Sequence, residues 1–255
     1  MRGDGDFFAL LPERPVLPLF GPSHSPPVLE ATTVFAFHCA EGVIVAGDRR
    51  ATSGTVVFSD KTEKILELDA HSLMAIAGVP AAAFEMARTL QTAFEFYRRS
   101  QLQPMSLAAK VRALSKLLRD NLPATLQGVG TVAPIFAGLE VADAQAKPVI
   151  FYYDPLGATF EATTFAASGS GALTIRSILH FLENWGRPRP QDMPLDQATA
   201  LAHRLLLTAA EFDTATGGVR PEKRLFATIK LLNREGIRTL QPEELERHWQ
   251  QAAAS

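Results

Sequence analysis

Two clusters of short β-rich runs, each followed by a pair of amphipathic segments, set the order of secondary structure in this chain. We expect the first five strands to form one antiparallel sheet and the first helix pair to pack together. Sheets and helices must bury their apolar faces against another layer, so this order predicts an α+β fold, a four-layer αββα sandwich of two antiparallel sheets with helices outside. The expected segments are strands at 33–38, 42–47, 55–58, 64–68 and 73–77, helices at 80–100 and 107–122, strands at 131–141, 148–153 and 160–167, helices around 172–182 and 195–209, a closing strand at 225–232 and a short helix at 243–251.

Local signals mark several boundaries. Pro80 suits the first position of a helix, and Ser106 suits an N-cap. Ala40-Glu41 is short enough for a hairpin, and the run from Asp154 to Gly157 has the composition of a turn. At 255 residues and 47% hydrophobic content, the chain can bury the core of one α/β domain.

The charge balance argues against nucleic acid or an anionic membrane as a partner. The formal net charge is −2, and no basic patch is evident. Cys39 is the only cysteine, so no intrachain disulfide can form, and the histidines lack metal-ligand spacing. We therefore expect no metal, no cofactor and no membrane segment. We expect proteins or small molecules as partners, and a cytoplasmic location.

Residues 1–31 form a separate leader. Its prolines are Pro12, Pro15, Pro18, Pro22, Pro26 and Pro27, a density that opposes helix and favours extended chain. Acidic residues and prolines interrupt every apolar stretch, so a secretory signal is not expected. Two interpretations stay open: a disordered tail, or a removable propeptide before a domain at 32–255.

Thr32-Thr33 lies between this leader and the first expected strand. A threonine at the start of a chain carries its own α-amine, which can accept the hydroxyl proton as a general base. The α-amine of an unstructured peptide has a pKa of about 7.7 to 8.0, so much of it can be uncharged near neutral pH. A cut before Thr32 would therefore create a nucleophile and base that the uncut chain lacks.

Six short motifs follow one another along the chain: Ala31-Thr32-Thr33-Val34, Val45-Ala46-Gly47-Asp48-Arg49-Arg50-Ala51-Thr52, Lys64-Ile65, Ala75-Ile76-Ala77-Gly78, Gly169-Ser170-Gly171 and Asp213-Thr214-Ala215-Thr216-Gly217-Gly218. In order and spacing they resemble the bacterial type of proteasome β-subunit, over the region from Thr32 to about Gln241. Each motif is weak alone, whereas the six together are specific. The resemblance implies an N-terminal nucleophile hydrolase with an αββα sandwich, and specifically a threonine endopeptidase that cleaves itself between Ala31 and Thr32.

The resemblance also implies partners. Family members assemble into seven-membered rings, and we expect a double ring here. Possible further partners are α-type subunits and an ATP-driven unfoldase that supplies unfolded protein substrates.

The resemblance assigns a role to each motif residue. Thr32 matches the nucleophile. Lys64 matches the lysine whose positive charge lowers the pKa of the Thr32 α-amine by like-charge repulsion. Asp48 matches the acid that pairs with this lysine, and the N–H of Gly78 matches the oxyanion-hole donor. The supporting residues beside the nucleophile correspond to Ser170, Asp213 and Thr216.

The residues alone leave simpler interpretations open. Lys64 could be a surface charge, Asp48 an ordinary turn residue and Gly78 a turn glycine. Ser170 and Asp213 could be residues at helix ends. Arg50, two residues after the aspartate, is expected to be structural.

The substrate-binding positions that the resemblance implies carry no charge. We therefore expect a preference for cleavage after apolar residues. These positions are Ala51, Thr52, Thr62, Leu66, Ile76, Pro80 and Phe84.

Ala31 departs from the family, which generally has glycine before the nucleophile. Its Cβ narrows the conformations open to the scissile bond, so processing could be slow or absent. Two other functions therefore stay open: a non-catalytic ring or scaffold component that keeps its leader, and an amidohydrolase of the same fold that acts on a small amide. The simpler two-ring bacterial protease of the same superfamily is a further alternative, although the length of this chain favours the proteasome type.

Overall fold

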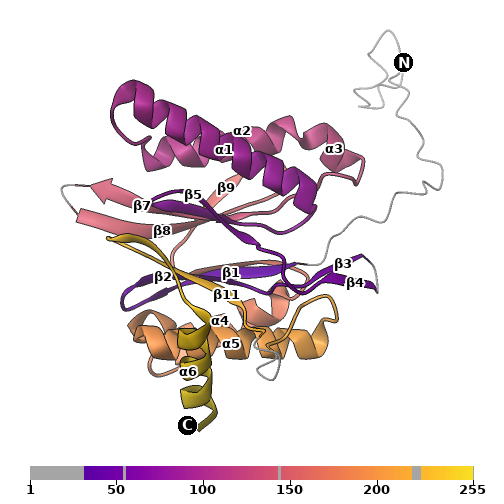
Figure 1. Cartoon of the computed structure of the whole chain (residues 1–255), viewed down its shortest axis with the longest axis vertical. Helices are drawn as coiled ribbons and strands as arrows, with labels where there is room; N and C mark the ends of the chain where they lie inside the picture. Colours follow the sequence, from indigo (N-terminus) through magenta and orange to yellow (C-terminus); the bar gives the residue numbers. More distant parts are fainter. Residues whose placement is uncertain (1–31, 54–55, 143–144, 220–224, 255) are drawn as a thin grey trace, which may run out of the picture.

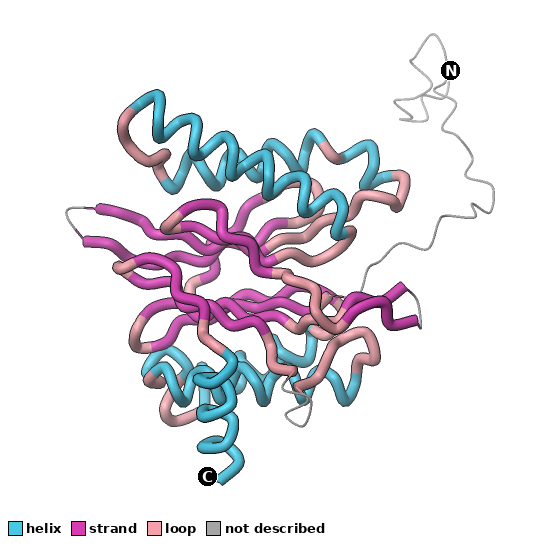
Figure 2. Tube along the Cα trace, viewed as in Figure 1, coloured by secondary structure: helices cyan, strands magenta, loops and turns pink. Residues whose placement is uncertain are grey.

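The computed structural model describes residues 32–53, 56–142, 145–219 and 225–254. In this part of the chain, two five-stranded antiparallel sheets face each other and helices cover both outer faces (Figure 1). The expected four-layer αββα sandwich is therefore confirmed (Figure 2). Ala31, the rest of the expected leader and Thr55 lie outside the described residues.

The first sheet has the strand order β10-β1-β2-β11-β12. Its strands are β1 (Thr33–Cys39), β2 (Gly42–Gly47), β10 (Phe165–Gly169), β11 (Thr228–Asn233) and β12 (Gly236–Thr239). β1 and β2 form the expected hairpin. Thr33 pairs with Gly169, so the start of β1 lies beside the end of β10.

The second sheet has the order β5-β6-β7-β8-β9. Its strands are β5 (Ile65–Asp69), β6 (Ser72–Ala75), β7 (Ile135–Ala142), β8 (Gln145–Tyr153) and β9 (Thr159–Ala162). β3 (Ala51–Ser53) and β4 (Val56–Ser59) form a separate two-stranded hairpin, which projects from one side of the sandwich (Figure 1).

Helices α1 (Pro80–Gln101), α2 (Leu107–Asp120) and α3 (Leu122–Leu126) cover the second sheet, and α4 (Ala172–Trp185) and α5 (Leu195–Phe212) cover the first (Figure 1). The short 3-10 helix η2 (Pro190–Asp192) precedes α5, and α6 (Pro242–Ala254) ends the described chain. Both predicted helix starts are confirmed: Pro80 opens α1, and Ser106 Oγ accepts a hydrogen bond from Ala109 N at 3.3 Å. None of the described helices combines the length and apolar composition of a membrane-spanning segment.

The hydrophobic core has three layers: one between the first sheet and its helices, one between the two sheets, and one between the second sheet and its helices. The central strands are therefore buried on both faces. In β1, Phe35 and Phe37 face α4 and α5, whereas Val34 and Ala36 face the second sheet. A third cluster, which includes Phe136 of β7, lies between the second sheet and helices α1 and α2. Strands of this kind read as continuous apolar runs, since successive side chains enter different core layers.

Three expectations about the strands were wrong. The first strands do not form one sheet: β1 and β2 belong to the first sheet, while β5 and β6 belong to the second. The expected strand 160–167 is two strands, because the chain crosses from β9 in one sheet to β10 in the other at residues 163–164. The polar strand β12 was missed because its sequence, Gly-Ile-Arg-Thr, carries little hydrophobic signal.

His203 is an unusual residue in the core layer between the first sheet and helices α4 and α5. It is fully buried on α5, against the rings of Phe226 and Trp249. Neither ring nitrogen has a hydrogen-bond partner within the described part of the chain. Burial, with a smaller contribution from the nearby His248, lowers the pKa of His203 to about 4.

This depressed pKa predicts acid sensitivity of folding. The unfolded chain takes up a proton on His203 below about pH 6.5, whereas the folded chain does so only near pH 4, so stability falls as pH falls between these values. Through His203, the free energy of unfolding should fall by about 2 kcal/mol when the pH is lowered from 7 to 5. Denaturant unfolding of His203→Leu at both pH values should show an acid loss smaller by that amount. The exposed His71 supplies the control His71→Leu, and an unchanged acid loss in His203→Leu would contradict the prediction.

Candidate active site

The carboxylate of Asp48 is the centre of the site. Asp48 directly follows β2, and its side chain is inaccessible to solvent. Oδ1 accepts hydrogen bonds from Thr33 N at 2.9 Å and from Lys64 Nζ at 2.6 Å. Oδ2 accepts from Arg50 N at 3.0 Å and from Gly217 N at 2.9 Å. A buried charge needs such partners, and these donors come from segments far apart in the sequence, so Asp48 is more than a turn residue.

Lys64 lies just before β5 with its side chain in the interior, so its interpretation as a surface charge is wrong. Burial lowers the pKa of Lys64 below its ordinary value, because the loss of hydration outweighs the attraction of Asp48. The positive charge of Arg50 acts in the same direction. The ammonium group of Lys64, with its lowered pKa, and the backbone N–H of Thr33 thus donate to the same oxygen atom, Asp48 Oδ1.

Thr32 is buried immediately before β1. Its carbonyl oxygen accepts a hydrogen bond from Ser170 N at 3.1 Å. Gly169 has a φ of +101°, and a Cβ at this position would lie 1.7 Å from that carbonyl oxygen, so the close approach requires glycine. The expected nucleophile is therefore held between the end of β10 and the Asp48–Lys64 pair.

Asp213 and Thr216 lie just after α5 and bond to each other. Thr216 Oγ1 donates to Asp213 Oδ2 at 2.5 Å, and Ala215 N donates to Asp213 Oδ1 at 3.0 Å. Partial burial alone would raise the pKa of Asp213, but hydrogen bonds from Ser170, Thr216 and the following backbone outweigh it and lower the pKa. Asp213 is also the C-cap residue of α5. The N-cap of α4 is Gly171, so the interpretation of Ser170 as a cap is wrong.

Gly78 has a φ of +103° and forms a bridge to Val132. The flanking hydrogen bonds run from Val79 N to Thr131 O at 2.8 Å and from Ala133 N to Ala77 O at 2.9 Å. In this antiparallel pattern the two bridged residues direct their own N–H groups away from each other. The Gly78 N–H is therefore not used in the bridge, which is a requirement for an oxyanion donor. A Cβ here would lie 2.1 Å from Thr131 O, so Gly78 is also a turn glycine.

The expected substrate-binding residues come from the hairpin strand β3, from β5 and β6 of the second sheet with their flanking segments, and from α1. Leu66, Ile76 and Phe84 belong to, or pack against, the hydrophobic cluster under α1. Thr62 N donates to Arg49 O at 3.0 Å, which ties the segment before β5 to the residues after Asp48. Contact of these side chains with a substrate stays a prediction. Ala51 and Thr52 lie on β3, Thr62 before β5, Leu66 on β5, Ile76 after β6, and Pro80 and Phe84 on α1.

The sequence reasoning missed Thr33 as a residue of the site. Its side chain is fully buried, Gly171 N donates to its Oγ1 at 3.0 Å, and this Oγ1 lies 2.6 Å from Thr216 Oγ1. A Cβ on Gly171 would lie 2.7 Å from Thr216 Oγ1 and 2.9 Å from Thr33 Oγ1. The doubled threonine and the Gly-Ser-Gly run were the available signals, but their relation to Thr216 depends on the fold.

Arg50 has the structural role expected of it. Its guanidinium donates to the carbonyl oxygens of Thr214 at 3.2 Å and Thr216 at 3.4 Å, and it pairs with Asp60 at 3.1 Å. Gly217 fits beside it, because a Cβ on Gly217 would lie 2.9 Å from the Cβ of Arg50. Arg50 therefore fixes the segment that carries Thr216.

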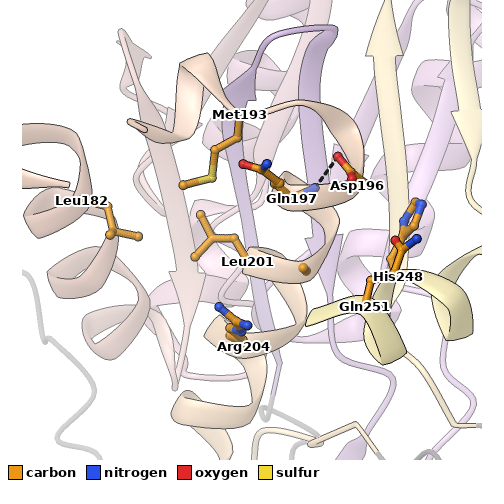
Figure 3. Close-up of a pocket in the computed structure, with 9 residues that line it drawn as sticks. Leu182, Met193, Asp196, Gln197, Leu201, Arg204, His248 and Gln251 are labelled. Atoms are coloured by element: carbon orange, nitrogen blue, oxygen red, sulfur yellow. Dashed lines mark hydrogen bonds between the residues drawn. The ribbon is translucent and has the colours of Figure 1, made fainter. Parts of the chain in front are cut away.

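A pocket of about 480 Å³ lies elsewhere, between α4, α5 and α6 (Figure 3). Met193 and Leu201 give it an apolar wall, and the carboxylate of Asp196 already accepts a hydrogen bond from Gln197 N. The pocket shares no lining residue with the Asp48 cluster and contains no bonded nucleophile and base, so we assign no chemistry to it. Across the described residues, no group of three or more His, Cys, Asp or Glu side chains could hold a metal ion.

Comparison with known proteins identifies one family. The family described as "Proteasome subunit" matches residues 28–219. "Proteasome subunit beta" of Stackebrandtia nassauensis is 34% identical, covering 93% of this chain and 82% of the relative. "Proteasome subunit beta 2" of Thermomonospora curvata is 37% identical, covering 86% and 75%. "Proteasome subunit beta" of Acidimicrobium ferrooxidans is 33% identical, covering 96% and 94%.

The family match spans Thr32, the Asp48–Lys64 pair and the Asp213–Thr216 segment, and the relatives cover most of both chains. This chain therefore belongs to the proteasome subunit family, as a threonine peptidase of the β type with the N-terminal nucleophile fold.

Proposed function

We propose that this chain is a self-processing endopeptidase subunit in which Thr32 becomes the N-terminal nucleophile. The observation that carries the proposal is the buried Asp48 carboxylate, which bonds both to Lys64 Nζ and to the backbone N–H that follows Thr32. A buried lysine with a lowered pKa has no evident structural advantage over an apolar side chain, since burying an ion pair seldom stabilises a fold. Its position beside residue 32 instead matches the need of a terminal amine for a neighbouring cation that lowers its pKa.

In the proposed reaction, Thr32 Oγ1 attacks the carbonyl carbon of the scissile peptide while its proton passes to the Thr32 α-amine. The Gly78 N–H stabilises the oxyanion. The protonated amine then gives its proton to the leaving nitrogen as the C–N bond breaks, which leaves an ester on Thr32. Water hydrolyses this ester by the same proton path. Ser170, Asp213 and Thr216 hold the nucleophile segment in position.

Self-processing would use the same hydroxyl group. Thr32 Oγ1 attacks the carbonyl carbon of Ala31, the hydroxyl proton is transferred to the Thr32 nitrogen as the peptide bond to it breaks, and water hydrolyses the resulting ester. The products are the leader 1–31, as a released propeptide, and a chain with a free α-amine on Thr32. The scaffold alternative, in which Ala31 prevents this step, predicts that the leader is retained.

Intact mass tests the processing step directly. Purified wild-type chain, given time to assemble, should show the mass of residues 32–255, whereas Thr32→Ala should keep its full length. Thr208→Ala is a matched control, because the hydroxyl of Thr208 donates to Arg204 O within α5. Full-length wild-type chain, with or without added α-type subunits, would support the scaffold alternative.

A substitution at Lys64 tests the electrostatic part of the site. Lys64→Met keeps much of the side-chain volume but removes the cation, so the pKa of the Thr32 amine should rise and the nucleophile should lose its base at neutral pH. We expect a fall in kcat/KM of at least about 100-fold. Stability should fall by about 3–5 kcal/mol, because Asp48 becomes an uncompensated buried charge.

Lys110 supplies a matched control for this prediction. It is also buried and paired with a carboxylate, at 2.5 Å from Asp69, but on α2 and away from Thr32. Lys110→Met should lose stability and yet keep its turnover per active site, where sites are counted by covalent labelling of the terminal threonine. Equal turnover per labelled site in Lys64→Met and Lys110→Met would overturn the proposed role of Lys64.

We further propose assembly into heptameric rings, as a double ring, with α-type subunits and an ATP-driven unfoldase as possible partners. Several large apolar side chains of α4 are exposed on the single chain, namely Leu173, Phe181 and Trp185. Such side chains are enriched at protein interfaces, which supports association of α4 with another subunit. A cytoplasmic location is proposed with this assembly; the one cysteine, Cys39, is a buried free thiol.

The expected apolar substrate-binding residues generate a prediction about specificity. Fluorogenic peptides that end in leucine or tyrosine before the scissile bond should be cleaved with higher kcat/KM than peptides that end in glutamate or arginine. The reason is that the expected substrate-binding positions, which include Leu66, Ile76 and Phe84, carry no charged side chain that could pair with a buried charge. Equal or reversed rates would contradict the expected pocket, and activity on a small amide with none on peptides would favour the amidohydrolase alternative.

A further inference from the structure

The hydroxyl of Thr33 joins two parts of the site that the sequence keeps far apart. Thr33 opens β1, directly after Thr32, and its side chain is fully buried. Its Oγ1 lies 2.6 Å from the Oγ1 of Thr216, which is 183 positions away in the sequence. Gly171 N donates to the same Oγ1 at 3.0 Å.

The proton positions in this group follow from simple counting. A threonine hydroxyl has one proton to donate, and Thr216 donates its proton to Asp213 Oδ2 at 2.5 Å. In the contact between the two threonines, Thr33 must therefore be the donor and Thr216 the acceptor. The result is a directed chain of hydrogen bonds that runs from Gly171 N through Thr33 and Thr216 to the Asp213 carboxylate.

The backbone of Thr33 is fixed as well. Its N–H donates to Asp48 Oδ1 at 2.9 Å, and its carbonyl oxygen accepts from Asp48 N at 3.1 Å. Thr33 is β-branched, so few side-chain rotamers are open to it. One residue thus connects the Asp48–Lys64 pair to the Asp213–Thr216 pair, and the peptide bond between residues 32 and 33 links this junction directly to Thr32.

We propose that Thr33 is a positioning residue for the Thr32 nucleophile. Its hydroxyl holds residue 32 in place through the hydrogen bonds to Thr216 and on to Asp213. It does not touch substrate. Without this hydroxyl, the start of β1 loses its side-chain anchor to the end of α5, and small displacements of a nucleophile can cost large factors in rate. This inference rests on the proposed function, because it concerns the geometry of the same nucleophile.

The test compares Thr33→Val, which keeps the shape but removes the hydroxyl, with Thr33→Ser, which keeps the hydroxyl. Turnover is measured with a fluorogenic peptide and divided by the number of sites that a terminal-threonine inhibitor labels. We expect kcat per site to fall at least about 10-fold in Thr33→Val, with KM within about twofold of wild type. Thr33→Ser should restore kcat to within about threefold.

Thr199→Val is the matched control. Thr199 is also a fully buried threonine, on α5, but its hydroxyl has no hydrogen-bond partner among the described residues. This variant should keep wild-type kcat per site. A merely structural role of Thr33 would lower the melting temperature and the number of labelled sites but leave kcat per site unchanged.

Each outcome decides the question. A kcat per site within twofold of wild type in Thr33→Val, or an equal loss in Thr33→Ser, would overturn the inference. A folded Thr33→Val chain that fails to process while Thr33→Ser processes would support it, since processing uses the same nucleophile. If Thr33→Val does not fold, Thr216→Val and Thr216→Ser remove and keep the same link from its other end.

An unlabelled, inactive wild type would overturn the proposed function and this inference together, whereas an active wild type with an equally active Thr33→Val would overturn this inference alone.

Discussion

The site depends on the hydrogen bonding of one buried carboxylate. Asp48 accepts from the backbone of residues 33, 50 and 217 and from Lys64 Nζ. Removing a charged group from water is costly unless its partners replace the lost hydration. This requirement brings four segments together at one end of the sandwich: the start of β1, the end of β2, the start of β5 and the loop after α5. That convergence also fixes the position of Thr32, the proposed nucleophile, since Thr32 precedes one of the bonded groups.

Glycine makes the same convergence sterically possible. Backbone segments approach so closely around residues 32 and 33 that a Cβ on Gly169 would lie 1.7 Å from the Thr32 carbonyl oxygen, and one on Gly171 would lie 2.7 Å from Thr216 Oγ1. Gly78 does the same for the segment that carries the expected oxyanion donor, 2.1 Å from Thr131 O. The glycines of these short motifs therefore lie where segments distant in the sequence approach closely, and Gly78 and Gly169 also have positive φ angles, which glycine adopts without steric cost.

The sequence predicted elements whose cause is local and missed those whose cause is tertiary. The β1–β2 hairpin, the Ser106 cap and the Pro80 helix start depend on neighbouring residues, and all three are present. The division of the first strands between two sheets, and the crossing at residues 163–164, depend on which layer each strand meets, and strands of both sheets contribute buried apolar residues to the layer between them. The motif resemblance placed Asp48 and Lys64 in one candidate site, and the two side chains bond to each other in the folded chain. Thr33 was missed because its partner Thr216 is near it only after folding.

The bonds that organise the site are already present in the uncut chain. The Asp48–Lys64 pair, the Ser170 bond to the Thr32 carbonyl and the Thr33–Thr216–Asp213 chain all form with residue 32 still in peptide linkage. Cleavage before Thr32, as proposed, would therefore add one chemical group, the α-amine, to an arrangement that is otherwise complete. A preorganised site needs little further reorganisation during reaction. Latency in this chain would then be covalent in origin: the fold supplies the geometry, and the base is withheld until the peptide bond is cut.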